Sequence, residues 1–155
     1  MRLLVMSDSH GDRHSVALAI EQQPTAAYVI HLGDGADDIE SLIPFYPDKT
    51  FVCVKGNCDF SSRLNAYEII SVGGKKVYVT HGYAERVKYG PELLCFSARE
   101  HDASLALFGH THTPLIDYND GLHLFNPGSI RDGNYGVVDI TSKGIICIAN
   151  KVRYR

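Results

Sequence analysis

The chain has 155 residues, of which 45% are hydrophobic and 21% are charged, and its formal net charge is −3. This length predicts a single domain, residues 1–155, and the composition excludes a disordered protein. The negative charge argues against a protein that binds long nucleic acid or lies on a membrane, and no apolar run reaches the about 18 residues of a membrane-spanning helix. Because the four cysteines show no C-x-x-C spacing, we expect a reduced, cytoplasmic protein.

Apolar runs and amphipathic segments alternate over the first third of the chain, and Pro24 and Pro44 end the two helical patterns. The predicted elements are a strand at 3–6, a helix at 14–22, a strand at 28–32, a helix at 36–43 and a strand at 50–54. This order is typical of a parallel, layered α/β sheet.

The pattern changes after residue 66, where turn signals join pairs of strands. The predicted elements are a hairpin at 67–80 around Gly73-Gly74, a helix at 91–102, a strand at 105–108, a hairpin at 115–125 around Asn119-Asp120-Gly121, and strands at 135–140 and 145–149. We therefore expect one α/β domain with mixed pairing, arranged as two sheets packed together.

Polar side chains with metal-binding potential follow five of the predicted strands. The junctions are Asp8-Ser9-His10-Gly11, Gly33-Asp34, Gly56-Asn57, Thr80-His81-Gly82 and Gly109-His110-Thr111-His112. In α/β sheets, ligands bind at the carboxyl ends of the strands, so these five junctions are expected to converge on one site. Most of the short motifs are weak alone, and their order along the chain is the informative feature.

The residue types in these junctions indicate divalent metal ions. Imidazoles and carboxylates without a thiolate suit Mn, Fe, Co, Ni or Zn. Seven candidate ligands are too many for one tetrahedral ion, but they suffice for two ions if one carboxylate bridges them. Two such cations can hold a phosphoryl group and lower the pKa of a water molecule to about 7.

Together with Asn126-Pro127-Gly128-Ser129, the ordered motifs resemble the calcineurin-like metallophosphoesterase superfamily, in particular its small prokaryotic YfcE-type phosphodiesterase branch. The resemblance implies a four-layer α/β/β/α sandwich of two mixed sheets. It also implies hydrolysis of a small phosphodiester by a hydroxide held between two divalent metals, Mn²⁺ or alternatively Ni²⁺, Fe²⁺ or Zn²⁺. By this resemblance the first metal is held by Asp8, His10 and His112, the second by Asn57, His81 and His110, and Asp34 bridges them; Asn57, His81, His110 and Cys58 form the catalytic set.

Cys58 departs from the pattern of many superfamily members, which carry a histidine directly after the Gly-Asn motif. A thiol with a pKa near 8.5 is a weaker general acid at neutral pH than an imidazole near 6.5. This difference predicts a preference for leaving groups that depart with little protonation.

Several neighbouring residues allow two interpretations. Asp59 either orients a histidine or is a turn residue, and His31 is expected to be packed and hydrogen-bonded rather than a ligand. His14, His101 and His123 are expected to be structural or surface residues. Arg13 is a candidate for a phosphate contact at a helix N-terminus, and Arg131 is a weaker candidate for an anion contact. The turn at Asn126–Ser129 is either structural or also touches substrate, and Tyr83, Tyr89 and Phe96 line a substrate pocket or simply pack.

Three other functions compete with the phosphodiesterase. One is a non-catalytic protein-interaction scaffold of the same fold, but all seven ligand positions are present here. The others are a nuclease and a phosphomonoesterase. A homodimer is a further expectation.

Overall fold

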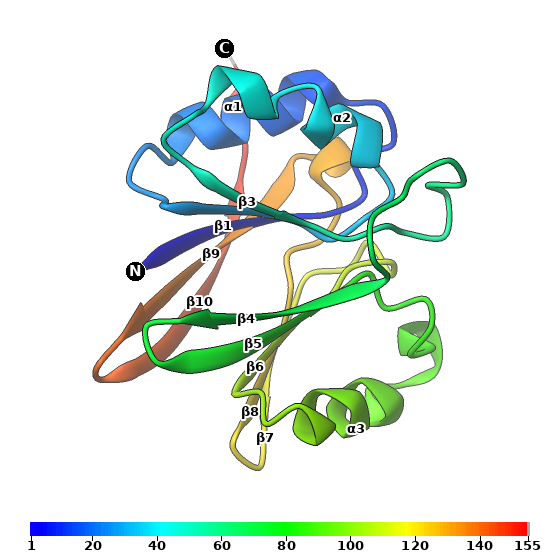
Figure 1. Ribbon diagram of the computed structural model, residues 1–155, viewed down its shortest axis with the longest axis vertical. Coiled ribbons are helices and arrows are strands. Elements are labelled where there is room, and N and C mark those ends of the chain that lie inside the picture. The colour runs from blue at the N-terminus through cyan, green and yellow to red at the C-terminus, as the bar shows by residue number, and fades with distance from the viewer. Residues whose placement is uncertain (155) are drawn as a thin grey trace.

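The computed structural model describes residues 1–154 and contains two five-stranded sheets packed face to face (Figure 1). The first sheet has the order β10-β9-β1-β2-β3 and the second the order β4-β5-β6-β8-β7. The strands of the first sheet are β1 (Arg2–Met6), β2 (Tyr28–His31), β3 (Thr50–Cys53), β9 (Asn134–Thr141) and β10 (Gly144–Lys151). Those of the second are β4 (Tyr67–Val72), β5 (Lys75–Thr80), β6 (Leu105–Leu107), β7 (Leu115–Asn119) and β8 (Leu122–Asn126).

Both sheets combine parallel and antiparallel pairs. In the first sheet β1, β2 and β3 are parallel, and β9 pairs antiparallel with β1 and β10. In the second sheet β5, β6 and β8 are parallel, and β4 and β7 pair antiparallel at its two edges. The carboxyl ends of the parallel strands of both sheets reach the right-hand side of Figure 1.

Helices cover the outer faces of the two sheets. Helices α1 (Arg13–Gln22) and α2 (Ala36–Glu40) lie on the first sheet, and α3 (Glu92–Glu100) lies on the second (Figure 1). Because side chains alternate along a strand, Leu3 and Val5 of β1 enter the core between the sheets, whereas Leu4 and Met6 enter the core beneath the helices. The predicted four-layer α/β/β/α sandwich is confirmed.

The two sheets approach each other closely where Gly136 of β9 faces the ring of Phe125 of β8. A Cβ atom at Gly136 would clash with the ring atoms Cε2 and Cζ. Phe125 is fully buried in the core between the sheets. A glycine is therefore required at this contact, where the two sheets come close together.

One predicted helix is shorter than expected. Helix α2 ends at Glu40, and the 3-10 helix η1 (Ile43–Phe45) follows instead of the predicted helical residues 41–43. Pro44 lies in the first turn of η1, where its missing N–H leaves no hydrogen bond unmade, and proline disfavours the α conformation at the residue before it. Within residues 1–154, no helix is long and apolar enough to cross a membrane.

Candidate metal centre

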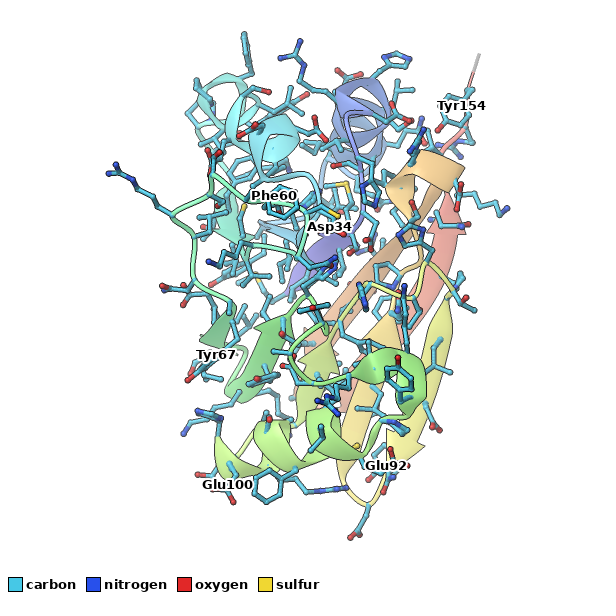
Figure 2. All side chains as sticks on the ribbon, turned by 90° about the vertical axis from the view of Figure 1, so that its right-hand side faces the viewer. Asp34, Phe60, Tyr67, Glu92, Glu100 and Tyr154 are labelled. Carbon is cyan, nitrogen blue, oxygen red and sulfur yellow. The ribbon has the colours of Figure 1, made fainter. Side chains whose placement is uncertain are left out.

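Loops from both sheets meet at the edge onto which Figure 2 looks. Asp8, Asp34 and Asn57 follow β1, β2 and β3 of the first sheet, while His81 and His110 follow β5 and β6 of the second. The five junctions expected to converge are therefore brought together, as the parallel pairing of these strands predicts.

The first cluster contains Asp8, His10 and His112, whose potential ligand atoms all lie within 4.8 Å of one another. Asp8 Oδ1 is 3.2 Å from Nε2 of His112 and 3.6 Å from Nε2 of His10. The other oxygen, Oδ2, accepts hydrogen bonds from the Ser7 hydroxyl and from the backbone N–H of His110, the latter at 3.1 Å. These bonds fix the fully buried Asp8 carboxylate and leave Oδ1 facing the two imidazoles.

The second cluster contains Asp34, His81 and His110, again within 4.8 Å. Asp34 Oδ2 is 3.3 Å from Nε2 of His81 and 3.8 Å from Nε2 of His10, so it lies between the two clusters. Its Oδ1 accepts the backbone N–H of Cys58 at 2.8 Å. Oδ1 of the exposed Asn57 is 3.0 Å from Nε2 of His81.

The orientation of His81 matches that of a metal ligand. Its Nδ1 lies 2.7 Å from the carbonyl oxygen of Leu32, to which it donates its proton. In the neutral ring Nε2 then carries a lone pair, and this atom faces the oxygens of Asp34 and Asn57. A cation among these atoms satisfies all of them, and a backbone carbonyl that fixes the second ring nitrogen is a regular feature of metal-binding histidines.

The electrostatics of the cluster reflect the same packing. Burial alone would lower the pKa of His81, but the hydrogen bond and charge of Asp34, together with the charge of Asp8, outweigh burial and raise it. Burial would raise the pKa of Asp34, yet His81 and the Cys58 N–H hold it well below its usual range. Burial and the charges of His81 and Lys88 lower the pKa of His110. The residues present therefore fit divalent cations.

The backbone of the site is strained. Five of the seven proposed ligands have positive φ angles, namely Asp8 (57°), His10 (44°), Asp34 (58°), His110 (70°) and His112 (62°). Non-glycine residues rarely adopt this conformation, and such strain concentrates at functional sites. The surrounding loops must therefore hold these residues in place.

Two glycines allow the loops to pack closely. A Cβ atom at Gly56 would lie 2.5 Å from the backbone nitrogen of Asp34 and would clash with its carboxylate. A Cβ atom at Gly109 would clash with the Ser7 hydroxyl and lie 2.8 Å from Oδ2 of Asp8. These two glycines are therefore required for close contacts between the loops that carry the candidate ligands.

Asp59 joins the loops after β2 and β3. Its Oδ2 accepts the backbone N–H groups of Asp34 and Gly56, at 2.8 and 2.7 Å, and its Oδ1 accepts those of Gly35 and Ala36, at 3.0 and 3.1 Å. Asp59 therefore contacts no histidine through these bonds. It fixes the backbone of Asp34 and supplies the carboxylate at the start of α2, where Gly35 has no capping side chain.

His31 is packed and hydrogen-bonded, as predicted. Its Nδ1 accepts the Gly33 N–H at 3.2 Å, and its Nε2 lies 3.0 Å from the hydroxyl of Ser9. That hydroxyl donates to Asp38, which also accepts the N–H of Gly11. Burial lowers the pKa of His31 to about 4 against the opposing charges of nearby aspartates. The chain of bonds ties the His10 loop to α2.

The Asn126–Ser129 turn supports the site from below. Asn126 is fully buried and donates to the carbonyl oxygen of Gly109 and the hydroxyl of Thr111, and Ser129 donates to the carbonyl oxygen of Asp8. These hydrogen bonds agree with the structural interpretation of this turn, and a contact with substrate stays a prediction.

Cys58 lies at the mouth of the cluster. Its side chain is exposed, and its Sγ, a carboxylate oxygen of Asp34 and a ring nitrogen of His10 lie within 4.8 Å of one another. Burial and the charge of Asp34 raise the pKa of this thiol. Its predicted part in catalysis stays a prediction.

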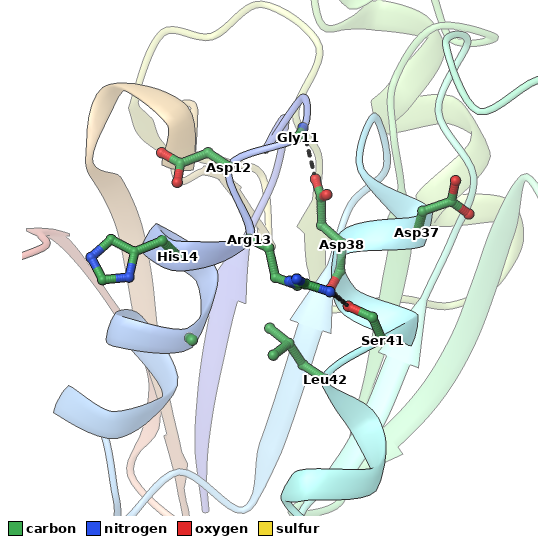
Figure 3. A pocket seen from close by; sticks show the side chains of 9 residues that line it. Gly11, Asp12, Arg13, His14, Asp37, Asp38, Ser41 and Leu42 are labelled. Atoms are coloured by element: carbon green, nitrogen blue, oxygen red, sulfur yellow. Dashed lines mark hydrogen bonds between the residues drawn. The ribbon is translucent and has the colours of Figure 1, made fainter.

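Arg13 lies beside the metal cluster in a hollow of about 610 Å³ between the starts of α1 and α2. Figure 3 shows its guanidinium directed toward Ser41, to whose hydroxyl it donates at 3.3 Å.

Arg131 and His14 are exposed, and Phe96 is 63% exposed on α3. Phe96 is therefore largely unpacked, and it does not line the hollow beside His110.

A second hollow of about 540 Å³ adjoins the metal cluster through His110. Tyr83 and Tyr89 line it, as one of the two interpretations predicted, together with Ala84, Arg86 and Lys88. Sequence reasoning missed the two cations, because nothing local to residues 86–88 indicates which way this loop faces.

Two mixed sheets that share a cluster of carboxylates and imidazoles at one edge define a metallophosphoesterase fold and site. The calcineurin-like phosphoesterase superfamily domain matches residues 1–143, and the chain belongs to this superfamily. It is 32% identical over 132 residues to the probable metallophosphoesterase YsnB of Bacillus subtilis, a match that covers 84% of this chain and 76% of that protein.

Two further similarities are to a phosphodiesterase and to a solved structure of the same fold. The chain is 26% identical to the phosphodiesterase YfcE of Escherichia coli K12 over an alignment of 177 positions, which covers 96% of this chain and 92% of that one. A crystal structure of a single mutant of Vps29 from Entamoeba histolytica matches with a TM-score of 0.73 at 22% identity, covering 99% of this chain and 100% of the other. This second similarity shows the fold alone.

Proposed function

We propose that the protein is a metal-dependent phosphodiesterase that hydrolyses small phosphodiesters with two divalent ions, Mn²⁺ first among them. The observation that carries this proposal is the convergence of seven nitrogen and oxygen ligands from five strand ends, around two buried carboxylates. The similarity to a phosphodiesterase supports the choice of a diester.

Each cluster would hold one ion. Asp8, His10 and His112 would hold the first, Asn57, His81 and His110 the second, and Asp34 would contact both because its Oδ2 faces imidazoles of both clusters. When bound, divalent cations neutralise phosphate oxygens and make water more acidic.

The chain itself positions the candidate ligands. The carbonyl of Leu32 holds the His81 ring so that Nε2 faces the site, and the His110 N–H fixes one oxygen of Asp8. The Cys58 thiol lies within 4.8 Å of ligand atoms of Asp34 and His10, and its raised pKa would make it a weak acid toward a departing group. We therefore propose that the protein acts best on esters whose leaving groups need little protonation.

The test is hydrolysis of bis(4-nitrophenyl) phosphate by purified protein that has been treated with chelator and then supplied with Mn²⁺, Ni²⁺, Fe²⁺ or Zn²⁺. We expect no activity after chelation, recovery with metal, and two ions per chain by metal analysis. Full activity with one tightly bound ion would overturn the dinuclear proposal.

The similarity to Vps29 gives one alternative, a non-catalytic interaction scaffold on the same fold. All seven ligand positions are occupied by metal-binding residue types, which argues for the enzyme. A folded protein that hydrolyses no diester with any of the four metals would favour the scaffold. We also propose a homodimer, which sedimentation velocity would test.

A further inference from the structure

The hollow beside His110 extends the metal site in one direction. The segment 83–89 forms one wall, and it follows the ligand His81 directly in sequence. Because His110 belongs both to the metal cluster and to the wall of the hollow, a phosphodiester at the metals has space to extend into it. Its volume of about 540 Å³ lies within the range of small-molecule sites.

The wall is held in one conformation from beneath. Glu85 is buried, and its carboxylate accepts the hydroxyls of Tyr78 and Thr80 at 2.9 and 3.1 Å. Val87 is also buried, and its N–H donates to the carbonyl oxygen of Gly82 at 3.2 Å. A wall fixed in this way holds the backbone that carries its outward side chains before a ligand arrives, which reduces the backbone entropy lost on binding.

The side chains that alternate with these anchors are cationic and aromatic. Arg86 and Lys88 are exposed and form no ion pair or side-chain hydrogen bond with residues 1–154, although the chain as a whole is acidic. Tyr89 is 88% exposed, and Tyr83 is 61% exposed with its ring edge-on to His110, at 5.5 Å between centroids. Unpaired cations beside exposed rings suit a ligand that has both a negative charge and a planar group.

We infer that the Tyr83–Tyr89 wall binds a second phosphate and the base of a nucleotide-type phosphodiester, a substrate class that rests on the proposed function. The scissile diester would lie at the metals, the second phosphate against Arg86 and Lys88, and the base on Tyr89. Two cations on a chain of net charge −3 suit a small ligand rather than a long polymer.

The test uses two esters that release the same leaving group, 4-nitrophenyl thymidine 5′-phosphate with and without a 3′-phosphate. Exposed ion pairs contribute up to about 1 kcal/mol each, so with two cations we expect kcat/KM to be roughly 3- to 30-fold higher for the 3′-phosphorylated ester. In Arg86→Asn and Lys88→Gln, the ratio of kcat/KM for the 3′-phosphorylated ester to kcat/KM for the ester without the 3′-phosphate should fall toward one. Asparagine suits position 86 because Arg86 has a φ of 53°.

Lys76→Gln is the matched control, since Lys76 is an exposed lysine near the start of β5, at the end of the strand away from His81. It should keep both the ratio and the activity of the parent. A ratio near one in the parent, or an unchanged ratio in both wall variants, would overturn the inference.

Tyr89→Ala tests the base. Stacking of a base on an aromatic side chain contributes about 1–3 kcal/mol, so kcat/KM for the thymidine ester should fall at least about fivefold relative to that for methyl 4-nitrophenyl phosphate. An equal change in kcat/KM for both esters would show that Tyr89 does not bind the base, and this part of the inference would be wrong.

Calorimetry with thymidine 3′,5′-bisphosphate separates this inference from the proposed function. If the parent hydrolyses none of the esters but binds the bisphosphate, and Arg86→Asn weakens binding about threefold or more, the wall is an anion site and the phosphodiesterase proposal fails. If the esters are cleaved with no preference and the bisphosphate does not bind, the inference about the wall fails and the phosphodiesterase proposal stands. If there is neither cleavage nor binding, both proposals fail.

Discussion

Replacing Asp59 by asparagine should loosen the loop that carries Asp34. An asparagine side chain retains one oxygen, so two of the four backbone hydrogen bonds survive and the new NH₂ group faces the other two N–H donors. A hydrogen bond to a charged group contributes about 1.5–3 kcal/mol when buried, and partial exposure of Asp59 reduces this to about 1–1.5 kcal/mol each. The expected loss is therefore about 2–3 kcal/mol, or roughly 5–10 °C in Tm for a chain of this size.

Urea denaturation followed by circular dichroism measures this loss, with chelator present so that metal binding does not contribute. Asp48→Asn is the control, because Asp48 is exposed and no side-chain hydrogen bond ties it to residues 1–154. Its free energy of unfolding should change by less than about 0.5 kcal/mol. If Asp59→Asn behaves like this control, the four bonds do not hold the loop and the argument is wrong.

Three other predictions concern the site. Asp34→Asn should abolish activity and reduce the metal content more than any other single ligand change, since Oδ2 faces both clusters; activity within tenfold of the parent would place the bridge elsewhere. Cys58→Ala should change kcat/KM little for aryl esters, whereas Cys58→His should accelerate alkyl esters more than aryl ones; a large loss in the alanine variant with metal content intact would show that the thiol takes part. The pKa of His31 is about 4 in the folded chain and about 6.5 in the unfolded chain. Above pH 6.5 His31 is neutral in both states and does not reduce the free energy of unfolding. Between pH 6.5 and 4 the unfolded chain binds a proton that the folded chain does not, so the free energy of unfolding should fall by up to about 3 kcal/mol. Denaturation of metal-free protein at pH 7, 5.5 and 4.5 should show a smaller decrease in His31→Gln, and equal decreases would contradict the argument.

The positions of the seven proposed ligands could be predicted because they depend on a local pattern. A polar residue just after a buried strand lies at the end of that strand, and parallel pairing brings such ends to one edge of a sheet. The partners of Asp59 could not be predicted in this way, because they depend on the pairing of β2 with β3, which brings residues 34 and 56 together. The length of α2 also depended on context, since the helical pattern continued to Ile43 and the chain turned at Ser41.

Arg86 and Lys88 show a second limit of prediction from sequence, because the direction in which a loop faces is not a local property. Their sequence neighbours give no indication that the loop returns to His110, a residue more than twenty positions further along the chain. The burial of Glu85 and Val87, with the hydrogen bonds of Glu85 to Tyr78 and Thr80, leaves the side chains between them facing outward.

The contact between Gly136 and Phe125 has a consequence for catalysis at a distance. Asp8 and Asp34 belong to one sheet and His81 and His112 to the other, so the separation of the sheets is also the separation of the two halves of the ligand set. Divalent ions accept only a narrow range of ligand distances. A larger side chain at position 136 would act as a wedge in the core, and it would reduce metal affinity without touching a single ligand. The packing between the two sheets would therefore help to set the geometry of the proposed metal site.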